Sequence, residues 1–165
     1  MNMISPIEQI DDTQEFTLER LFVGTVDMMG YVVDFRGQIT RRFVAEATGH
    51  LGDKGVITID EELRYLGDGE PETRQWVLTP RGTGYRAETH QLVGPGTIKR
   101  VSASTLEWSY DIKIPVNGNE ITVKMVDQMV GLGDGRATAL TKITKFGLPV
   151  GKIVSSYVRR TTFSE

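Results

Sequence analysis

Residues 105–129 constrain the fold of this chain more than any other segment. Large apolar residues occupy every second position from Leu106 to Ile114, with polar residues between them. This two-residue period predicts an antiparallel strand with one apolar face and one wet face, which Pro115 is expected to end. Asn117-Gly118 is a residue pair that tight hairpin turns prefer, and the segment returning to Met129 repeats the alternation. The two strands therefore form a hairpin that must cover an apolar core.

The same period recurs along most of the chain. The other predicted strands are 21–29, 31–35, 39–51, 55–66, 74–78, 85–93, 136–144 and 152–159. Glycine-rich turns separate them, and Gly147, Pro149 and Gly151 mark the last loop. Residues 14–20 can form one helical turn, with Asp11, Asp12 or Thr13 as candidate N-caps. No long amphipathic helix is predicted, so the chain reads as all-β.

The number and order of these strands predict the architecture. Successive hairpins with one apolar face each can bury it in a two-sheet sandwich or in a closed barrel. Roughly eight to ten strands in simple meander order favour an antiparallel up-and-down β-barrel. The 165 residues fit a single domain. We predict that a flexible N-terminal segment, residues 1–14, precedes a barrel domain over residues 15–165.

Composition excludes several classes of function. The net charge of −3 gives no support for nucleic-acid binding. The lack of cysteine excludes disulfides, thiolate metal sites and cysteine nucleophiles, and His50 and His90 stand alone, so we expect neither a metal nor a cofactor. No apolar run is long enough to span a membrane, and the first residues do not resemble a signal peptide. We expect a cytoplasmic protein, or a periplasmic or membrane-associated one if an export signal precedes this sequence.

Three charged residues share a strand face with large apolar side chains, and they are the candidates for chemistry. They are Glu61, Arg74 and Asp127. A charge on an apolar face is costly unless it is paired. They can form an internal ion-pair network, or lie at strand ends where the charge reaches water. Alternatively, Arg74 can clamp a ligand head group, held in place by Glu61 or Asp127. In a third interpretation, Asp127 or Glu61 is a general base.

An ordered series of short blocks resembles a family of uncharacterised proteobacterial proteins that are often described as lipoproteins. The blocks are residues 21–24, 30–34, 37–43, 60–61, 65, 68–70, 74–76, 106–110, 127 with 129, and 145–147. They run from about Phe16 to Arg159. The resemblance implies a lipocalin-like fold, a calycin-type barrel. Some members are encoded near enzymes that modify membrane fatty acyl chains, which favours a lipid ligand.

This chain departs from the family pattern at three places. Relatives usually carry a second acidic residue and an aromatic residue near Asp127, where this chain has Val126, Gln128 and Met129. They often carry an Asn-Arg pair where this chain has Ala139-Leu140. Many have a lipobox cysteine, which is absent here, so the sequence as given is not that of a lipoprotein.

We therefore expect a lipocalin-like barrel that binds a small apolar ligand, fatty-acyl or otherwise lipid-like. The predicted ligand-binding residues are Leu63, Tyr65, Trp76, Trp108, Met125, Arg74, Glu61 and Asp127. Such a ligand also allows peripheral association with a membrane. The first alternative is a cofactor-independent enzyme on a lipid-like or cyclic substrate, with Asp127 or Glu61 as base. The second is an interaction protein whose barrel is filled by its own side chains.

Overall fold

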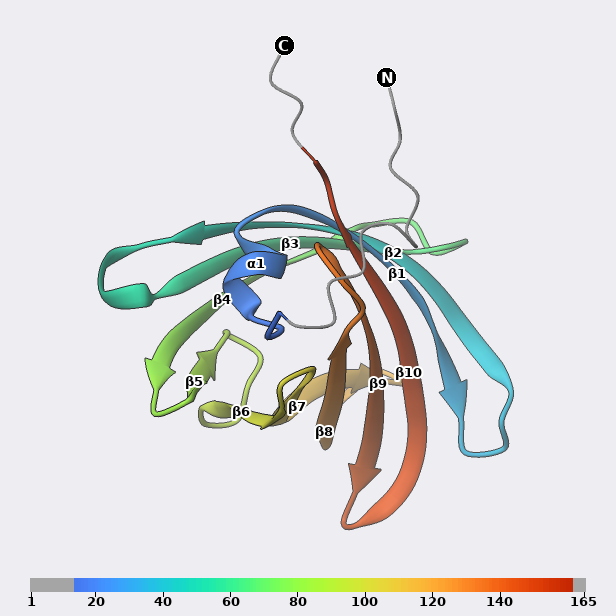
Figure 1. Cartoon of the computed structure of the whole chain (residues 1–165). Helices are drawn as coiled ribbons and strands as arrows, with labels where there is room; N and C mark the ends of the chain where they lie inside the picture. Colours follow the sequence, from blue (N-terminus) through green and yellow to red (C-terminus); the bar gives the residue numbers. More distant parts are fainter. Residues whose placement is uncertain (1–13, 162–165) are drawn as a thin grey trace.

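The computed structural model describes residues 14–161, which form one short helix and a closed barrel of antiparallel strands (Figure 1). The bounds are α1 Leu18–Phe22, β1 Gly24–Asp34, β2 Ile39–Leu51, the 3₁₀ turn η2 Asp53–Gly55, β3 Ile57–Tyr65, β4 Glu72–Arg81, β5 Gly84–Glu88, β6 Gly96–Ser102, β7 Thr105–Val116, β8 Asn119–Gly131, β9 Arg136–Lys145 and β10 Leu148–Arg159. The predicted N-terminal segment lies almost wholly outside the described residues.

Each strand pairs with its neighbours in the sequence, and β1 closes the ring by pairing with β10. This closing pair runs from Val26 opposite Arg159 to Asp34 opposite Gly151. The prediction of an all-β, lipocalin-like up-and-down barrel is thereby confirmed. A closed ring removes the free strand edges that an open sheet would expose.

The helix α1 closes one end of the barrel. Its N-cap is Thr17, whose Oγ1 accepts the backbone N–H of Arg20 at 3.3 Å. Leu18, Leu21 and Phe22 are buried and pack against the residues at that end of the lumen. The prediction placed the helix and its cap too early, because the polar residues before Thr17 satisfy capping rules as well as Thr17 does.

Several strand boundaries also differ from the prediction. The strand β6 was not recognised, and the strand predicted over 85–93 ends at Glu88. Pro115 lies inside β7, next to the hairpin turn, where a missing N–H costs little. Pro149 and Gly151 lie inside β10 at a β-bulge, so the last turn contains only Phe146 and Gly147. The prediction that Pro149 and Gly151 mark a loop was therefore wrong, whereas Gly147 does lie in the turn.

Gly30 shows why one strand position must lack a side chain. An added Cβ would lie 2.1 Å from the carbonyl oxygen of Val154 and 2.7 Å from the Phe43 ring. Gly30 and Phe43 are register partners in β1 and β2, so the Phe43 ring covers the glycine from the facing strand. This arrangement lets the two strands curve sharply around the lumen.

The end opposite α1 is the mouth of the barrel. A second cluster of buried apolar residues lies toward it, formed by Ile112, Val123, Met125 and Ile143. The β1–β2, β7–β8 and β9–β10 hairpins project at this end (Figure 1). The lumen is thus closed on one side by a helix and lined by aliphatic residues on the other.

Candidate functional site

The strand alternation directs a mixed set of side chains into the middle of the lumen. They enclose a central cavity of about 120 Å³. Its lining includes six of the eight predicted ligand-binding residues, namely Glu61, Leu63, Arg74, Trp76, Trp108 and Asp127. Tyr65 instead stacks edge-on against Phe43 nearer the mouth, with the Arg41 guanidinium 3.3 Å above its ring. Met125 belongs to the second apolar cluster. The cavity shows that the barrel is not filled completely by its own side chains.

Aromatic rings form one wall of the central cavity. The rings of Trp76 and Trp108 pack edge to face with their centres 5.7 Å apart. Tyr110 packs against Trp76 in the same way, with 5.5 Å between the ring centres. Phe22 from α1 contacts Trp108 and Tyr157 from the end of the lumen that the helix closes. Such edge-to-face packing fixes the ring positions. The wall is therefore apolar, rigid and provided by elements that are far apart in the sequence.

Glu61 and Arg74 face each other across β3 and β4 as register partners. Burial raises the pKa of Glu61 above its ordinary value, and the positive charge of Arg74 opposes that shift. The guanidinium carbon of Arg74 lies 5.9 Å from the centre of the Trp76 ring. The positive charge of Arg74 is thus already compensated within the lumen by the carboxyl of Glu61.

Asp127 lies across the cavity on β8 and is 9% exposed. Burial raises the pKa of Asp127 from 3.8 to about 6, although hydrogen bonds from Thr141 and Tyr110 act in the opposite direction. The Tyr110 hydroxyl donates to Oδ2 at 3.4 Å. Burial and the charge of Asp127 hold the pKa of Tyr110 well above its ordinary value, so this phenol stays protonated. The Asp127 carboxyl, with a pKa of about 6, is therefore the member of the pair that can gain and lose a proton.

Three buried polar atoms of the cavity lining have no hydrogen-bond partner among residues 14–161. They are Arg74 Nε, Trp108 Nε1 and Asp127 Oδ1. An unsatisfied buried donor or acceptor costs about 1–3 kcal/mol, so such groups are rare in folded proteins. Two donors and one acceptor in one cavity provide the polar contacts that a bound molecule requires.

Sequence reasoning missed several residues of the lining. Thr141, Ser155 and Tyr157 project into the cavity from β9 and β10. Both strands were predicted, and the alternation of Ile153, Ser155 and Tyr157 places these side chains on one face. None of the missed residues is charged, so the sequence analysis did not single them out. Phe22 could not be found in this way, since it reaches the lumen from a helix rather than a strand.

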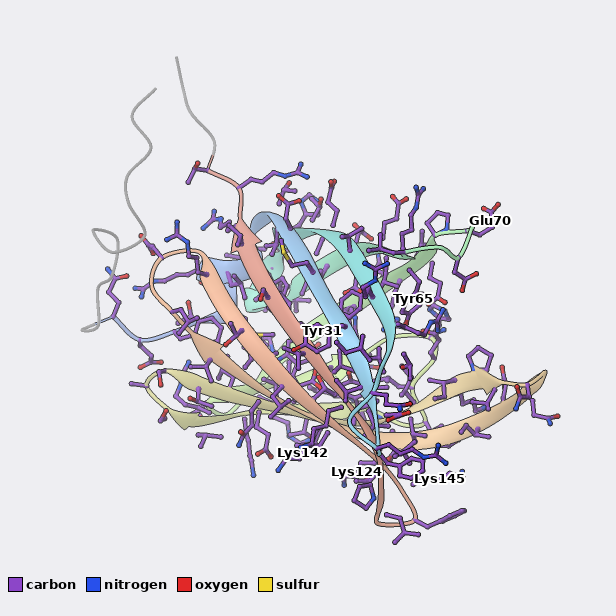
Figure 2. All side chains as sticks on the ribbon, turned by 90° about the vertical axis from the view of Figure 1, so that its right-hand side faces the viewer. Tyr31, Tyr65, Glu70, Lys124, Lys142 and Lys145 are labelled. Atoms are coloured by element: carbon purple, nitrogen blue, oxygen red, sulfur yellow. The ribbon has the colours of Figure 1, made fainter. Side chains whose placement is uncertain are left out.

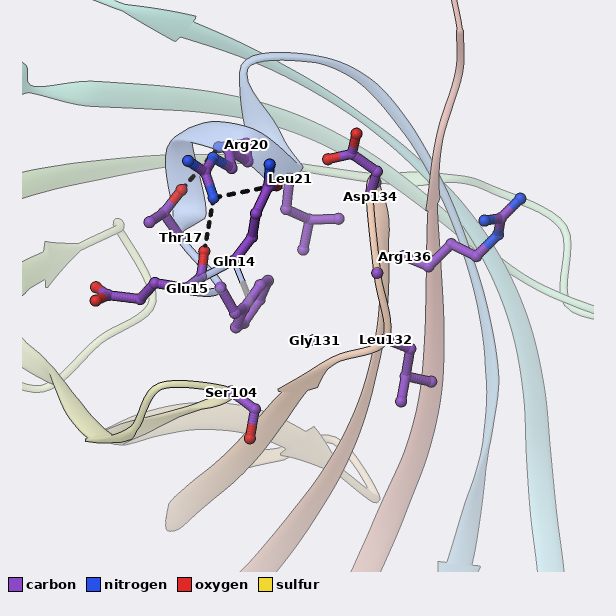
Figure 3. A pocket seen from close by; sticks show the side chains of 13 residues that line it. Gln14, Glu15, Thr17, Arg20, Leu21, Ser104, Gly131, Leu132, Asp134 and Arg136 are labelled. Carbon is purple, nitrogen blue, oxygen red and sulfur yellow. Dashed lines mark hydrogen bonds between the residues drawn. The ribbon is translucent and has the colours of Figure 1, made fainter. Parts of the chain in front are cut away.

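A second hollow, the helix cleft, lies outside the lumen beside α1 (Figure 3). It has a volume of about 320 Å³ and lies between residues 14–21, Ser104 and residues 131–136. The Arg20 guanidinium there donates to the Glu15 carbonyl at 2.9 Å and to the Gln14 side chain at 3.4 Å. Among the described residues, none of the buried unpartnered atoms lines this cleft. We therefore regard the central cavity as the candidate site.

Within the described range, no three His, Asp or Glu side chains gather as metal ligands would. None of the helical segments between residues 14 and 161 has the length and apolar character needed to cross a bilayer.

The fold and the cavity define a lipocalin-like barrel protein. Residues 3–159 match the model of the family DUF3833, described as proteins of unknown function, and the chain belongs to this family. No curated protein matches the sequence. The barrel is similar to the solved structure of an S-type phycobiliprotein lyase from Guillardia theta, with a TM-score of 0.64 and 11% identity over 86% of this chain and 89% of that one. At such low identity the similarity shows the fold alone.

Proposed function

We propose that this protein binds a small ligand with an apolar body and an oxygen-bearing head group in its central cavity. The observation that carries the proposal is the set of unpartnered atoms on Arg74, Trp108 and Asp127. A ligand oxygen can accept from Arg74 Nε and Trp108 Nε1 while it shares a hydrogen with Asp127 Oδ1. Specific ligand pockets combine apolar walls with a few converging polar groups of this kind.

The charges in the lumen favour a head group that enters without a charge. One guanidinium faces two carboxyls, those of Glu61 and Asp127. An anionic head group would therefore meet a lumen that has no surplus positive charge when both carboxyls are ionised. Protonation of Asp127, whose pKa is about 6, removes one negative charge. A fatty alcohol or ester, or a fatty acid at acidic pH, fits this balance best.

The size of the cavity limits the part of the ligand that lies deep in the barrel. About 120 Å³ is less than the 150 Å³ or so in which a benzene ring fits. A longer tail would extend through the second apolar cluster toward the mouth. Met28 and Met129 line the cavity, and their flexible side chains can make additional room.

A titration that compares two ligands of equal chain length tests the proposal. Both tryptophans of the chain line the cavity, so intrinsic fluorescence reports on it directly. We expect a medium-chain fatty alcohol to bind equally at about pH 5 and about pH 8, whereas the matching fatty acid binds at least about tenfold more weakly at the higher pH. Arg74→Met should weaken both ligands, and Arg86→Met, on the outer surface, should not.

Two outcomes would contradict the proposal at different levels. If neither ligand changes the emission and solvent extraction of the purified protein yields no lipid-like molecule, the binding proposal is wrong. If both ligands bind and Arg74→Met has no effect, the cavity binds ligands but the head-group assignment is wrong.

Asp127 also supports a second candidate function, which is proton transfer without a cofactor. Its carboxyl has a pKa of about 6 and one free oxygen facing the cavity. A general base works best when its pKa lies near the operating pH. If a bound lipid-like or cyclic compound is converted, Asp127→Asn should abolish turnover and preserve binding. Unchanged turnover in that variant would exclude Asp127 as the base.

A further inference from the structure

Two neighbouring hairpins carry large apolar side chains at the mouth of the barrel. We call Phe35, Ile39, Phe146, Leu148, Val150, Lys142, Lys145 and Lys152 the tip surface. Phe146 is 92% exposed, Phe35 70% and Leu148 69%. The two turns are adjacent because Asp34, which precedes Phe35, pairs with Gly151 of β10. The apolar tips therefore lie on one part of the rim.

The conformation of Phe146 has no explanation in the stability of the barrel. Phe146 and Gly147 form a two-residue turn with φ of 51° and 78°. The corresponding turn between β7 and β8 has φ of 50° and 80° and contains Asn117 and Gly118, the pair that such turns prefer. A phenylalanine in the left-handed region is strained, and an exposed ring gains little from packing. A residue that breaks a local rule in this way commonly serves a function.

Positive charge surrounds these apolar tips. Residues 142–152, the part of the β9–β10 hairpin toward the mouth, contain three lysines and no Asp or Glu, although the whole chain has a net charge of −3. The Lys145 ammonium lies 4.6 Å from the centre of the Phe146 ring, and the Arg36 guanidinium lies 5.3 Å from that of Phe35. Asp34 is the acidic residue of the β1–β2 turn, and its carboxylate accepts the backbone N–H groups of Arg36 and Gln38.

Lys142 and Lys152 face each other across β9 and β10. Their other register partners are Val126 and Val33, so neither has an acidic residue opposite it in the sheet. Like charges at directly opposed positions destabilise a sheet. Figure 2 shows Lys124, Lys142 and Lys145 near one another and Glu70 well away from them. Lys124 has Asp111 opposite it, but the Lys142–Lys152 pair matches an anionic surface better than it serves the fold.

We propose that the tip surface docks the barrel on a membrane that contains anionic lipids. Aromatic and aliphatic side chains on protruding turns can enter the fluid interface, while the lysines behind them bind lipid phosphates. Separate convex tips suit a deformable lipid surface better than a protein partner, which would need a matching pocket for each tip. Ile153, three residues after Val150, lines the central cavity, so docking would bring the mouth of the lumen to the bilayer. This inference does not depend on which ligand the cavity binds.

Sedimentation of the full chain with vesicles tests the proposal. We expect binding to phosphatidylcholine vesicles that contain phosphatidylglycerol, weaker binding to phosphatidylcholine alone, and release by added salt. Phe146→Asn should reduce the partition coefficient by about tenfold or more. The double variant Lys142→Gln with Lys152→Gln should reduce it by about fivefold for each lysine.

The same variants separate docking from folding. Phe146→Asn restores the preferred turn sequence, and the lysine variants remove a repulsion, so all should unfold at the same or a higher urea concentration than the parent. Leu51→Asn changes an exposed apolar residue at the far end of β2 and should leave vesicle binding unchanged. Failure of the parent to bind anionic vesicles, or parent-like binding by Phe146→Asn, would overturn the proposal.

A label can identify the side of the barrel that touches the bilayer. The chain has no cysteine, so Phe146→Cys and Leu51→Cys each accept a single polarity-sensitive dye. We expect anionic vesicles to shift the emission of the dye at position 146 to the blue and to leave the dye at position 51 unchanged. A shift at position 51 alone would assign binding to the opposite end and refute the tip surface.

Discussion

Asp127 lies where a carboxylate is least well solvated in this barrel. The aromatic wall excludes water from it, and one of its oxygens has no partner in the described part of the chain. The protonation state of Asp127 therefore affects the free energy of unfolding. The pKa is about 6 in the folded chain and 3.8 when the group is solvated, so the folded state binds this proton more tightly.

The pH dependence of stability should show this difference. Because the folded state holds the proton, the free energy of unfolding decreases as pH rises from about 4 to about 6 and stays lower above that range. Asp127→Asn cannot ionise, so it should raise the free energy of unfolding at about pH 8 by up to about 3 kcal/mol and have little effect near pH 4. Urea unfolding at several pH values measures this, with Asp134→Asn on the surface as control. A loss of stability in Asp127→Asn that is equal at all pH values would contradict the prediction.

Gly30 supports a second prediction for a single residue. Gly30→Ala places a Cβ 2.1 Å from a backbone carbonyl oxygen, and backbone cannot move aside as a side chain can. We expect the free energy of unfolding to fall by about 1–3 kcal/mol or more. Gly69→Ala is the matched control, because nothing lies within 4 Å of its added Cβ. Thermal unfolding of the two variants decides the matter, and equal melting temperatures would show that β1 can shift.

Among the elements, α1 has the most influence for its length. Five residues close one end of the lumen, and three of them are buried. Leu21→Ala should cost about 2–5 kcal/mol and weaken ligand binding, because it leaves a void below the aromatic wall. Glu19→Ala, on the exposed side of the same helix, should change neither quantity. If Leu21→Ala unfolds at the urea concentration of the parent, α1 does not close the barrel as tightly as the structure indicates.

The strands were predictable to a large extent because alternation is local information. The faces of β3, β7 and β8 follow directly from their apolar residues, and these strands position Glu61, Trp108 and Asp127. Short strands with few apolar residues, such as β5 and β6, carry too little of this signal. The bulge in β10 was hidden because Pro149 and Gly151 are also turn residues. Which atoms lack partners depends on distances across the lumen, and no local pattern contains them.

At the scale of the whole molecule, the two apolar clusters share Tyr110 and Leu92 as neighbours. The barrel should therefore unfold as one unit. We expect urea curves from tryptophan fluorescence, which report the lumen, to coincide with those from far-ultraviolet circular dichroism, which report the strands. Separate midpoints would show that the mouth or the helix end melts independently.

The pairing of β1 with β10 also has a consequence for the synthesis of the protein. The strand β1 cannot complete its pairing until β10 is present, since Val26 and Arg159 lie opposite each other near the two ends of the described chain. A ribosome must release the chain through the whole of β10 before the ring can close, and until then β1 has a free edge. The closed cavity therefore cannot form before β10 has been synthesised, so a ligand that needs the closed cavity cannot guide the earlier strands as they emerge.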